Sequence, residues 1–277
     1  MALRCSAVLF DLDGTLLDEE LSARCGLTAT CSWASALTDV SADRIQAAAE
    51  AVGPDAWLAL DTEGYHAAFG ITWEEVCWGQ FGPETEAHHP VLSREHRRYR
   101  TAIWRSILAS VGVDDPAVAD AVAERHAAER AATHLLFPHA LRVLGTLAPS
   151  FRLGLVTNGP RDLQMAKLER ARPHHCASAT ETVRLLDLLD PIVISGEVGF
   201  HKPNPALFRV ALERCGVGPS QAVYVGDSQR RDLCGATAAG IQTVWVNRTG
   251  AALLPGVPPP AAQISCLEQL PPLLLAP

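Results

Sequence analysis

The chain has 277 residues, of which 48% are hydrophobic and 19% charged. This composition is sufficient for a hydrophobic core and excludes a wholly disordered chain, and the length suggests a core domain with a substantial insert or one large domain. With 23 Lys and Arg against 31 Asp and Glu, the net charge of −8 argues against nucleic-acid binding, which normally requires a basic excess. An anionic substrate must therefore be attracted by local cations or a metal ion.

No apolar run approaches the roughly 18–20 residues needed to span a bilayer. The N-terminal residues lack the small-residue cleavage pattern of a signal peptide. The eight cysteines form no C-x-x-C pair and are spread along the whole chain, so we interpret them as reduced thiols. We therefore expect a cytoplasmic protein without a membrane partner.

The first predicted element is a buried strand at residues 6–10, an apolar run that ends at Asp11. The next segment is rich in alanine, arginine and glutamate and contains almost no strand signal. Apolar residues recur at helical spacing within residues 94–111, and residues 117–132 consist almost entirely of helix formers. We predict a helical module for residues 18–136.

Strand and helix signals alternate after this module. Beyond the first strand, short apolar runs predict strands at residues 152–156, 192–194, 222–225 and 243–246. Helical patterns predict helices that open at Pro138 and that cover residues 161–170, 208–215, 232–239 and 267–274. Such alternation is typical of an α/β fold with a parallel sheet and helices on both faces. Residues 1–17 and 137–277 are expected to form this core, with the helical module as an insert.

Binding sites in parallel sheets form beyond the carboxyl ends of the strands, and polar residues follow the first four predicted strands. These residues are Asp11-Leu12-Asp13-Gly14-Thr15, Thr157-Asn158-Gly159, His201-Lys202-Pro203 and Gly226-Asp227-Ser228, with Asp232 five positions after Asp227. Each segment alone is compatible with an ordinary turn, a solvated lysine or a helix cap. Their occurrence in this order, each at a strand end, favours a functional site.

The residue types at these strand ends suit phosphoryl transfer. Crowded carboxylates repel one another unless a cation lies among them, and Mg²⁺ accepts one or two carboxylates while retaining water. A carboxylate can attack phosphorus and form an aspartyl-phosphate, and a second acid can protonate the leaving alcohol and later activate water. Lys202, Thr157 and Asn158 supply the donors that a phosphoryl group requires.

The four segments resemble the motifs of the haloacid dehalogenase superfamily of phosphohydrolases. The first motif of the superfamily, Asp-x-Asp-Gly-Thr, is matched by residues 11–15. The second motif is a Thr or Ser at the end of the next strand, matched by Thr157, and the third is a lysine, matched by Lys202. The fourth, Gly-Asp-x-x-x-x-Asp, is matched by residues 226–232. The amino-acid sequences of residues 155–159, 194–197 and 245–250 resemble those of one branch of the superfamily. This branch includes acylneuraminate-9-phosphatases and pyrimidine 5′-nucleotidases.

The resemblance implies a role for each matched residue. Asp11 would be the nucleophile and Asp13 the general acid/base. Mg²⁺ would be held by Asp11, by the main-chain carbonyl of Asp13 and by Asp227. Asp232 would lie behind these ligands and position Lys202 or a metal-bound water. Thr157, Asn158 and Lys202 would bind the phosphoryl oxygens of a small phosphorylated metabolite. The implied fold is a Rossmann-like sheet of strand order 5-4-1-2-3 with an inserted α-helical cap of the C1 type.

Three other readings remain open. A 2-haloacid dehalogenase attacks carbon without a metal and lacks the second aspartate of the first motif, whereas Asp13 is present here. A phosphomutase of the same fold would return the phosphoryl group to a sugar. A non-catalytic binding module would usually have lost one of the motif acids, and this chain retains them all.

Two features of the helical module are candidate substrate selectors. Residues 88–100 contain a basic cluster that fits either contact with an anionic substrate tail or a solvated helix face. Trp73, Trp78 and Trp104 fit stacking on a base or sugar, or simple core packing. The segment at residues 172–183 is longer than the usual link in the family, and we interpret it as a surface excursion.

Overall fold

The computed structural model describes residue 3, residues 5–173 and residues 184–275. By their contacts the residues group into two compact units. The sheet unit comprises Met1–Glu19, Leu135–Asn158 and Ala171–Pro277, and the helical unit comprises Glu20–His134 and Gly159–Arg170. Residues 159–170 thus group with the helices, although they follow a strand of the sheet along the chain.

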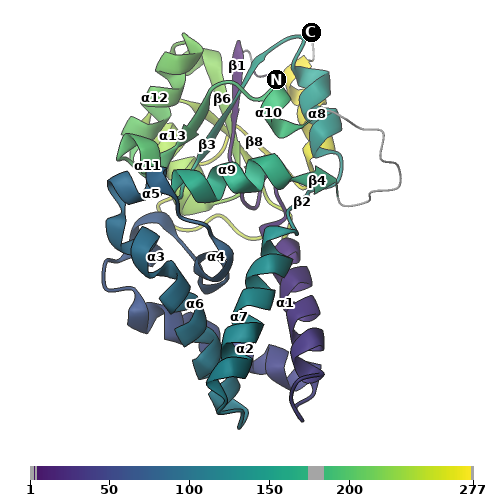
Figure 1. The fold of residues 1–277 in the computed structure, drawn as a ribbon. Helices are drawn as coiled ribbons and strands as arrows, with labels where there is room; N and C mark the ends of the chain where they lie inside the picture. Colours follow the sequence, from purple (N-terminus) through teal and green to yellow (C-terminus); the bar gives the residue numbers. More distant parts are fainter. Residues whose placement is uncertain (1–2, 4, 174–183, 276–277) are drawn as a thin grey trace. The chain divides into compact units, whose positions relative to one another are not determined.

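The sheet unit contains a six-stranded sheet in which all neighbouring strands are parallel (Figure 1). The strands are β1 (Ala7–Phe10), β3 (Arg152–Thr157), β5 (Ile192–Ile194), β6 (Ala222–Gly226), β7 (Gln242–Val246) and β8 (Ala262–Ile264), in the order β5-β3-β1-β6-β7-β8. The five predicted strands are confirmed, and read from β7 to β5 they have the expected order 5-4-1-2-3. The edge strand β8 is an addition that we did not predict.

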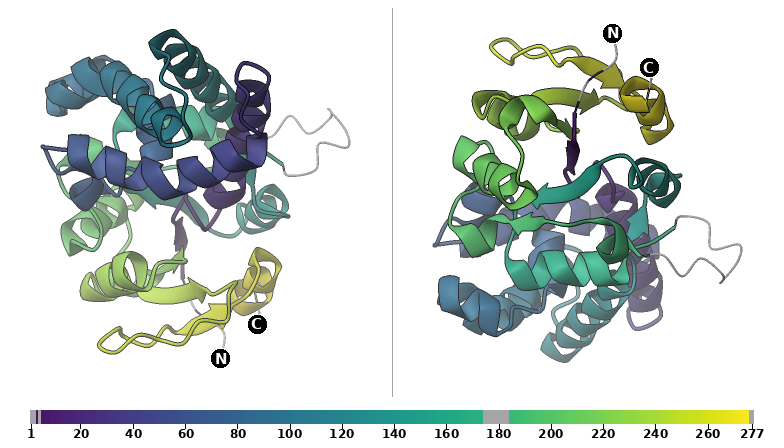
Figure 2. Two further views of the ribbon diagram at one scale, coloured as in Figure 1. Left: turned by 90° about the horizontal axis from the view of Figure 1, so that it is seen from below. Right: turned by 90° about the horizontal axis from the view of Figure 1, so that it is seen from above.

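The central strands are apolar because helices cover both faces of the sheet. β1 is buried along its whole length, as expected for a middle strand of a parallel sheet. On one face, Ala7 and Leu9 pack against Leu207 and Phe208. Figures 1 and 2 show the helices of this unit on the two sides of the sheet. They are α8 (Ala140–Leu147), α10 (Leu185–Leu188), α11 (Ser195–Val198), α12 (Pro205–Cys215), α13 (Cys234–Ala238) and α14 (Leu270–Leu275).

Local sequence signals set the ends of α12. Asn204 caps the helix by accepting a hydrogen bond from the Ala206 N–H at 2.9 Å, and Pro205 occupies the first turn, where its missing N–H costs nothing. Gly216 ends the helix with a left-handed φ of 68°, a conformation that glycine adopts without strain. The helix predicted at residues 208–215 is confirmed, and it begins three residues earlier, at Pro205.

The two chain segments that leave and re-enter the sheet unit pair with each other. Leu17 and Leu136 form an antiparallel bridge, the Asp18 N–H donates to the Leu135 carbonyl at 2.8 Å, and the Phe137 N–H donates to the Leu16 carbonyl at 2.9 Å. Next to this bridge, β2 (Leu135–Leu136) pairs with β4 (Arg172–Pro173). The remainder of the predicted excursion at residues 172–183 lies outside the described residues.

The helical unit is an all-helical bundle around its own core. Its helices are α1 (Glu19–Ser35), α2 (Ala42–Leu60), α3 (Tyr65–Phe69), α4 (Trp73–Trp78), α5 (Pro83–His88), α6 (Pro90–Ser110), α7 (Pro116–Ala131) and α9 (Arg161–Arg170). Trp73, Trp78 and Trp104 are buried in this core, which makes them packing residues in this structure rather than exposed stacking platforms. Among the described residues, none of these helices or those of the sheet unit is both long and apolar enough to cross a membrane.

Candidate active site

The sheet brings the predicted site residues to one edge. In the strand register, Phe10 at the end of β1 lies beside Leu155 of β3 and Val225 of β6. The ends of the three strands are therefore aligned. Asp11 follows β1, Thr157 is the last residue of β3, and Asp227 follows β6. The Asp11 N–H donates to the Val225 carbonyl at 3.0 Å and extends this alignment by one residue. The convergence predicted from the strand ends is present in the structure.

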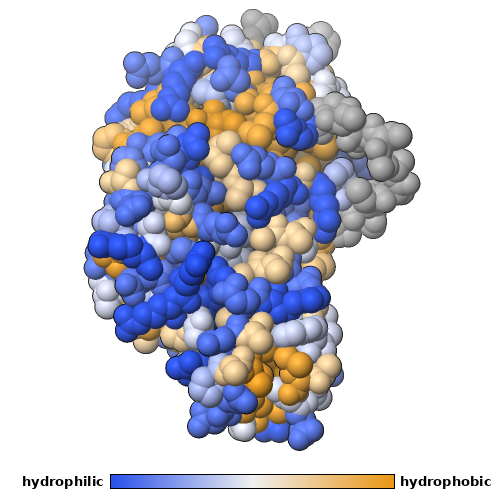
Figure 3. All heavy atoms as spheres, viewed as in Figure 1, coloured by the Kyte–Doolittle hydropathy of each residue, from blue (hydrophilic) through white to orange (hydrophobic). Residues whose placement is uncertain are grey.

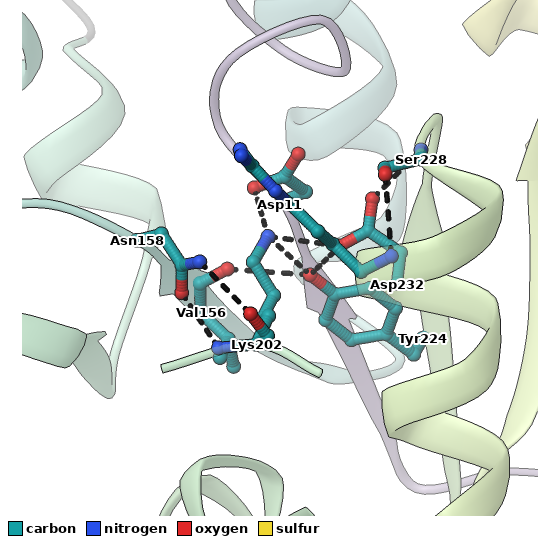
Figure 4. A network of polar contacts seen from close by, with 8 residues as sticks. Asp11, Val156, Asn158, Lys202, Tyr224, Ser228 and Asp232 are labelled. Atoms are coloured by element: carbon teal, nitrogen blue, oxygen red, sulfur yellow. Dashed lines mark hydrogen bonds and ion pairs between the residues drawn. The ribbon is translucent and has the colours of Figure 1, made fainter. Parts of the chain in front are cut away.

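Lys202 lies at the centre of the site. Its ammonium Nζ is 2.5 Å from Asp11 Oδ1 and 2.8 Å from Asp232 Oδ1, and all three side chains are buried (Figure 4). Burial alone lowers the pKa of Lys202, but the two carboxylates outweigh that effect and hold its pKa above the ordinary value. Lys202 is therefore a fixed positive charge beside the proposed nucleophile.

The sequence did not single out Tyr224, which joins the same network from within β6. Its hydroxyl lies 3.2 Å from Lys202 Nζ, 3.0 Å from Asp232 Oδ1 and 3.2 Å from the Val156 carbonyl (Figure 4). β1 lies between β6 and β3 in the sheet, so this side chain reaches over the central strand to the residue before Thr157. Tyr224 thus connects three strand ends of the site.

Asp232 is held by its surroundings and not only by Lys202. Its second oxygen accepts a hydrogen bond from the Ser228 N–H at 2.9 Å, and the residue lies in a π-helical turn, Gln229–Leu233. Such wide turns are frequent at functional sites. The predicted helix at residues 232–239 therefore begins earlier, with this turn, and continues as α13. Ser228 caps this turn by accepting a hydrogen bond from the Arg231 N–H at 3.3 Å, as the cap pattern of Gly226-Asp227-Ser228 allows.

Three carboxylates form a compact acidic cluster. Oxygen atoms of Asp11, Asp227 and Asp232 lie within 4.8 Å of one another. Burial and the carboxylates of Asp232 and Asp227 raise the pKa of Asp11 well above its ordinary range, although Lys202 opposes this shift. Burial and then Asp232 raise the pKa of Asp227 to about 6. One ammonium does not balance three carboxylates, so the donor set fits a divalent cation that prefers oxygen ligands.

The turn that follows β1 passes close to Asp227 of the acidic cluster. Gly14 has a φ of 80°, and a Cβ at this position would lie 2.5 Å from Asp227 Oδ2. Only glycine allows the loop to adopt this conformation and to pass so close to the carboxylate. Asp13 is half-buried immediately before this contact.

The residues after β3 show two different placements. Thr157 is buried at the end of the strand. The Asn158 side chain is engaged with the main chain of Lys202: its Oδ1 accepts from the Lys202 N–H at 2.8 Å, and its Nδ2 donates to the Lys202 carbonyl at 3.2 Å (Figure 4). This pair of hydrogen bonds fixes the loop that carries the lysine. A direct contact of Asn158 with phosphate stays a prediction.

The basic residues at 88–100 do not form one continuous exposed cluster. Arg100 is buried and donates to Glu124 at 3.0 Å, and Arg98 pairs with Glu95 on the surface. Hydrophilic side chains gather over α6 in the space-filling view (Figure 3). Within the helical unit a polar hollow of about 600 Å³ is lined by Gln80, Phe81, Gly82, His96, Arg97, Arg100, Glu124 and Asp162. Whether any of these residues contacts substrate stays a prediction.

The cysteines agree with the expectation of thiols. The seven cysteines within the described ranges are all free, and Cys31, Cys77 and Cys215 are buried. Burial raises the pKa of the Cys31 thiol to about 12. The three buried cysteines therefore act as apolar filling.

Comparison with known proteins places these features in a family. The family model of haloacid dehalogenase-like hydrolases matches residues 5–240. The phosphoserine phosphatase of Thermus thermophilus is 34% identical over 252 residues, which are 87% of this chain and 88% of that protein. The N-acylneuraminate-9-phosphatase of Mus musculus is 28% identical over 274 residues, 98% of this chain and 94% of that protein.

Solved structures share the fold over nearly the whole chain. The hydrolase YfnB from Bacillus subtilis, solved with magnesium bound, has a TM-score of 0.64 at 21% identity, with coverage of 98% of this chain and 99% of that one. A 2-haloacid dehalogenase from Pseudomonas syringae pv. Tomato has a TM-score of 0.54 at 26% identity, with 97% of each chain covered. The solved structures that share this fold therefore include a dehalogenase.

Proposed function

This chain belongs to the haloacid dehalogenase-like hydrolases and is a phosphatase of that family, and we propose that it hydrolyses a small phosphomonoester with Mg²⁺ through an aspartyl-phosphate on Asp11. The observation that carries this proposal is the buried contact of Asp11 with Lys202, beside the carboxylates of Asp227 and Asp232. An acidic oxygen, a fixed cation and a carboxylate cluster that fits a metal ion are the parts that phosphoryl transfer to a carboxylate needs.

We propose the following steps for the reaction. A carboxylate oxygen of Asp11 attacks phosphorus, the bond from phosphorus to the alcohol oxygen breaks, and Asp13 gives that oxygen its proton. Asp13 then removes a proton from water, the water oxygen attacks phosphorus, and the bond to Asp11 breaks to release phosphate. Lys202 and the Thr157 hydroxyl compensate the charge on the phosphoryl oxygens, while Asn158 holds the Lys202 loop in place.

The residues that would hold the metal are Asp11, Asp227 and the main-chain carbonyl of Asp13. A bound Mg²⁺ would supply positive charge to the phosphoryl oxygens and neutralise the crowded carboxylates. Asp232 already bonds to Lys202, Tyr224 and the Ser228 N–H, so we propose that it positions the lysine rather than binding the ion directly.

The substrate is proposed to be a small phosphorylated metabolite. The similarity to a phosphoserine phosphatase and to an N-acylneuraminate-9-phosphatase makes phosphoserine and sialic-acid phosphates the first candidates. Both are anions, so a chain with a net charge of −8 must bind them through local cations such as Lys202.

The experiment combines a substrate panel with one substitution. Phosphate release is measured with magnesium on phosphoserine, sialic-acid phosphates, phosphorylated sugars, nucleotides and phosphoglycolate, for the native chain, Asp11→Asn and Asp55→Asn. The last variant is a control because Asp55 is an exposed carboxylate in the helical unit. We expect loss of activity only in Asp11→Asn, and acid-quenched native enzyme should carry a phosphoryl group on the peptide that contains Asp11. Phosphatase activity retained by Asp11→Asn would contradict the covalent mechanism.

A second candidate is a 2-haloacid dehalogenase, because a dehalogenase shares the fold at 26% identity. Asp13 and the acidic cluster favour metal-assisted phosphoryl transfer instead. The two activities differ in their products and in their need for a metal. Halide release from a 2-haloacid that persists in excess chelator would support the dehalogenase, whereas phosphate release that the chelator abolishes supports the phosphatase.

A further inference from the structure

Arg248 has no place in the site as predicted from the sequence, yet it contacts the loop that follows the nucleophile. The residue lies two positions beyond the end of β7. Its Nη1 donates to the Gly14 carbonyl, and its Nη2 donates to the Thr15 carbonyl at 2.9 Å. A planar guanidinium that donates to two consecutive carbonyl groups fixes both their position and their direction.

The same guanidinium covers the segment through which the chain returns to the sheet unit. Its central carbon lies 3.4 Å from the centre of the Phe137 ring, a cation–π contact. Phe137 in turn donates its N–H to the Leu16 carbonyl. Arg248 therefore contacts both paired crossing segments directly, one through hydrogen bonds and the other through an aromatic ring.

The turn that carries Arg248 is itself held in place. The buried Asn247 accepts a hydrogen bond from the Ala251 N–H and donates to the Ala251 carbonyl, each at 2.9 Å. Two side-chain bonds across a five-residue turn leave the base of the arginine little freedom. The hydrogen bonds from Arg248 to the loop thus originate from a rigid part of the sheet unit.

We propose that Arg248 is a positioning residue that orients Asp13 for proton transfer by holding the carbonyl groups of Gly14 and Thr15. This inference rests on the proposed function, because it assigns Arg248 a part in the same reaction. Gly14 is bonded to Asp13 and packs against Asp227, so a shift of this loop moves the acid relative to the acidic cluster. A misplacement of about 1 Å can cost on the order of 100-fold in rate.

The test exploits the dependence of the reaction on its leaving group. The value of kcat/KM reports the steps up to release of the alcohol. The leaving group of phenyl phosphate is phenol, which needs a proton from Asp13 to leave. The leaving group of 4-nitrophenyl phosphate is 4-nitrophenol, which needs little protonation. For Arg248→Ala we expect kcat/KM to fall about 10- to 100-fold on phenyl phosphate and less than about threefold on 4-nitrophenyl phosphate. Methylguanidine in the buffer should restore part of the loss. Arg209→Ala is the matched control, since Arg209 is exposed on α12.

A second measurement separates this inference from the proposed function. Hydrogen exchange of the amides at residues 12–17 should be faster in Arg248→Ala than in the native chain, because the Gly14 and Thr15 N–H groups bond within the loop that Arg248 holds. If Arg248→Ala does not fold, Arg248→Lys, which retains the charge without the two-pronged donor, should show the same pattern more weakly. Unchanged exchange, or an equal loss on both substrates without rescue, would overturn the proposal. A native chain inactive on every phosphate ester, with faster exchange in the variant, would instead refute the proposed function.

Discussion

A buried lysine organises the site at the level of single residues. Lys202 lies within 2.8 Å of carboxylate oxygens from two different segments, and Tyr224 approaches it from a third. Lys202 cannot move closer to Asp11 without stretching its contacts with Asp232 and with the Tyr224 hydroxyl. The network therefore holds the lysine in one place before substrate arrives, which is what electrostatic stabilisation of a transition state requires.

Removal of the Tyr224 hydroxyl should weaken this organisation without emptying the core. Tyr224→Phe retains the ring that packs edge-on against Phe208, but loses the contacts with Lys202, Asp232 and the Val156 carbonyl. We expect kcat to fall about tenfold, or about 1.4 kcal/mol, which is the net value of about one buried hydrogen bond, with KM little changed. Steady-state kinetics on the best substrate of the panel measures this. A variant with native kcat would show that Asp11 and Asp232 alone hold the lysine.

Asp13 should have a separate kinetic signature from Asp11. In Asp13→Asn the aspartyl-phosphate still forms from 4-nitrophenyl phosphate, whose leaving group needs little protonation, but its hydrolysis lacks a base. We expect one rapid equivalent of 4-nitrophenol per enzyme, followed by turnover about 10²- to 10⁴-fold slower than in the native chain. Stopped-flow absorbance measures both phases. Steady turnover at the native rate would assign the acid/base role to another residue.

The structural elements show which sequence signals were sufficient and which were not. β1 and β6 were predictable because middle strands of a parallel sheet are apolar along their whole length, and Gly216 marked the end of α12. β8 has only three residues and contains a polar glutamine, so its pairing depends on β7 rather than on its own pattern.

The site was predictable wherever its residues stand at strand ends in a recognisable order. Tyr224 was missed because an aromatic residue inside an apolar strand suggests core packing, and its hydroxyl partners come from distant segments. Arg248 was missed because its partners are main-chain carbonyl groups more than 200 positions away, and carbonyl groups leave no pattern in the sequence.

The grouping of α9 with the helical unit has a physical basis in two polar contacts. Lys167 and Glu75 form a buried ion pair at 2.6 Å, which joins α9 to α4. Asp162 accepts hydrogen bonds from the Gly82 N–H, the Thr85 N–H and the Thr85 hydroxyl, which joins α9 to the start of α5. Burial raises the pKa of Glu75, but Lys167 outweighs it and lowers that pKa below the ordinary value.

Breaking one partner of this ion pair should destabilise the helical unit. Glu75→Gln removes the negative charge of Glu75 from the buried Lys167 ammonium, and we expect the free energy of unfolding to fall by about 3–5 kcal/mol. The double variant Glu75→Gln with Lys167→Met should recover most of this loss, because it removes both charges of the pair. Urea unfolding measures all three proteins. Glu20→Gln, which removes the exposed ion pair with Arg24, is the control and should cause almost no change.

Among the described residues, each of the two units has a hydrophobic core of its own. Five of its six tryptophans, at positions 33, 57, 73, 78 and 104, belong to the helical unit, and Trp245 belongs to the sheet unit. Tryptophan fluorescence therefore reports mainly on the helical unit, whereas metal binding is expected to stabilise the sheet unit that holds the acidic cluster. The two units can thus be followed separately during unfolding of the whole chain.

Acid should unfold the helical unit because of one buried histidine. His126 is stacked on Trp73 and its Nδ1 lies 3.3 Å from the Thr30 hydroxyl, while its Nε2 has no partner among the described residues. Burial, then Arg130 and Arg100, lower its pKa from 6.5 to about 3. The folded unit therefore holds this ring neutral, whereas the unfolded chain binds a proton as the pH falls below 6.5, so stability is lost between pH 6.5 and 3. From pH 7.5 to pH 5 we expect a loss of about 2 kcal/mol from this group alone.

The measurement is urea unfolding by tryptophan fluorescence at pH 7.5 and pH 5 for the native chain, His126→Leu and His88→Leu. His126→Leu cannot take up this proton, so its stability should change less between the two pH values than that of the native chain, whatever its absolute stability. His88 is exposed in the same unit, and its variant should follow the native pH dependence. If the native chain and His126→Leu lost the same stability between pH 7.5 and pH 5, other groups would be responsible for the proton uptake. The burial of His126 would then not be the cause of acid unfolding of the helical unit.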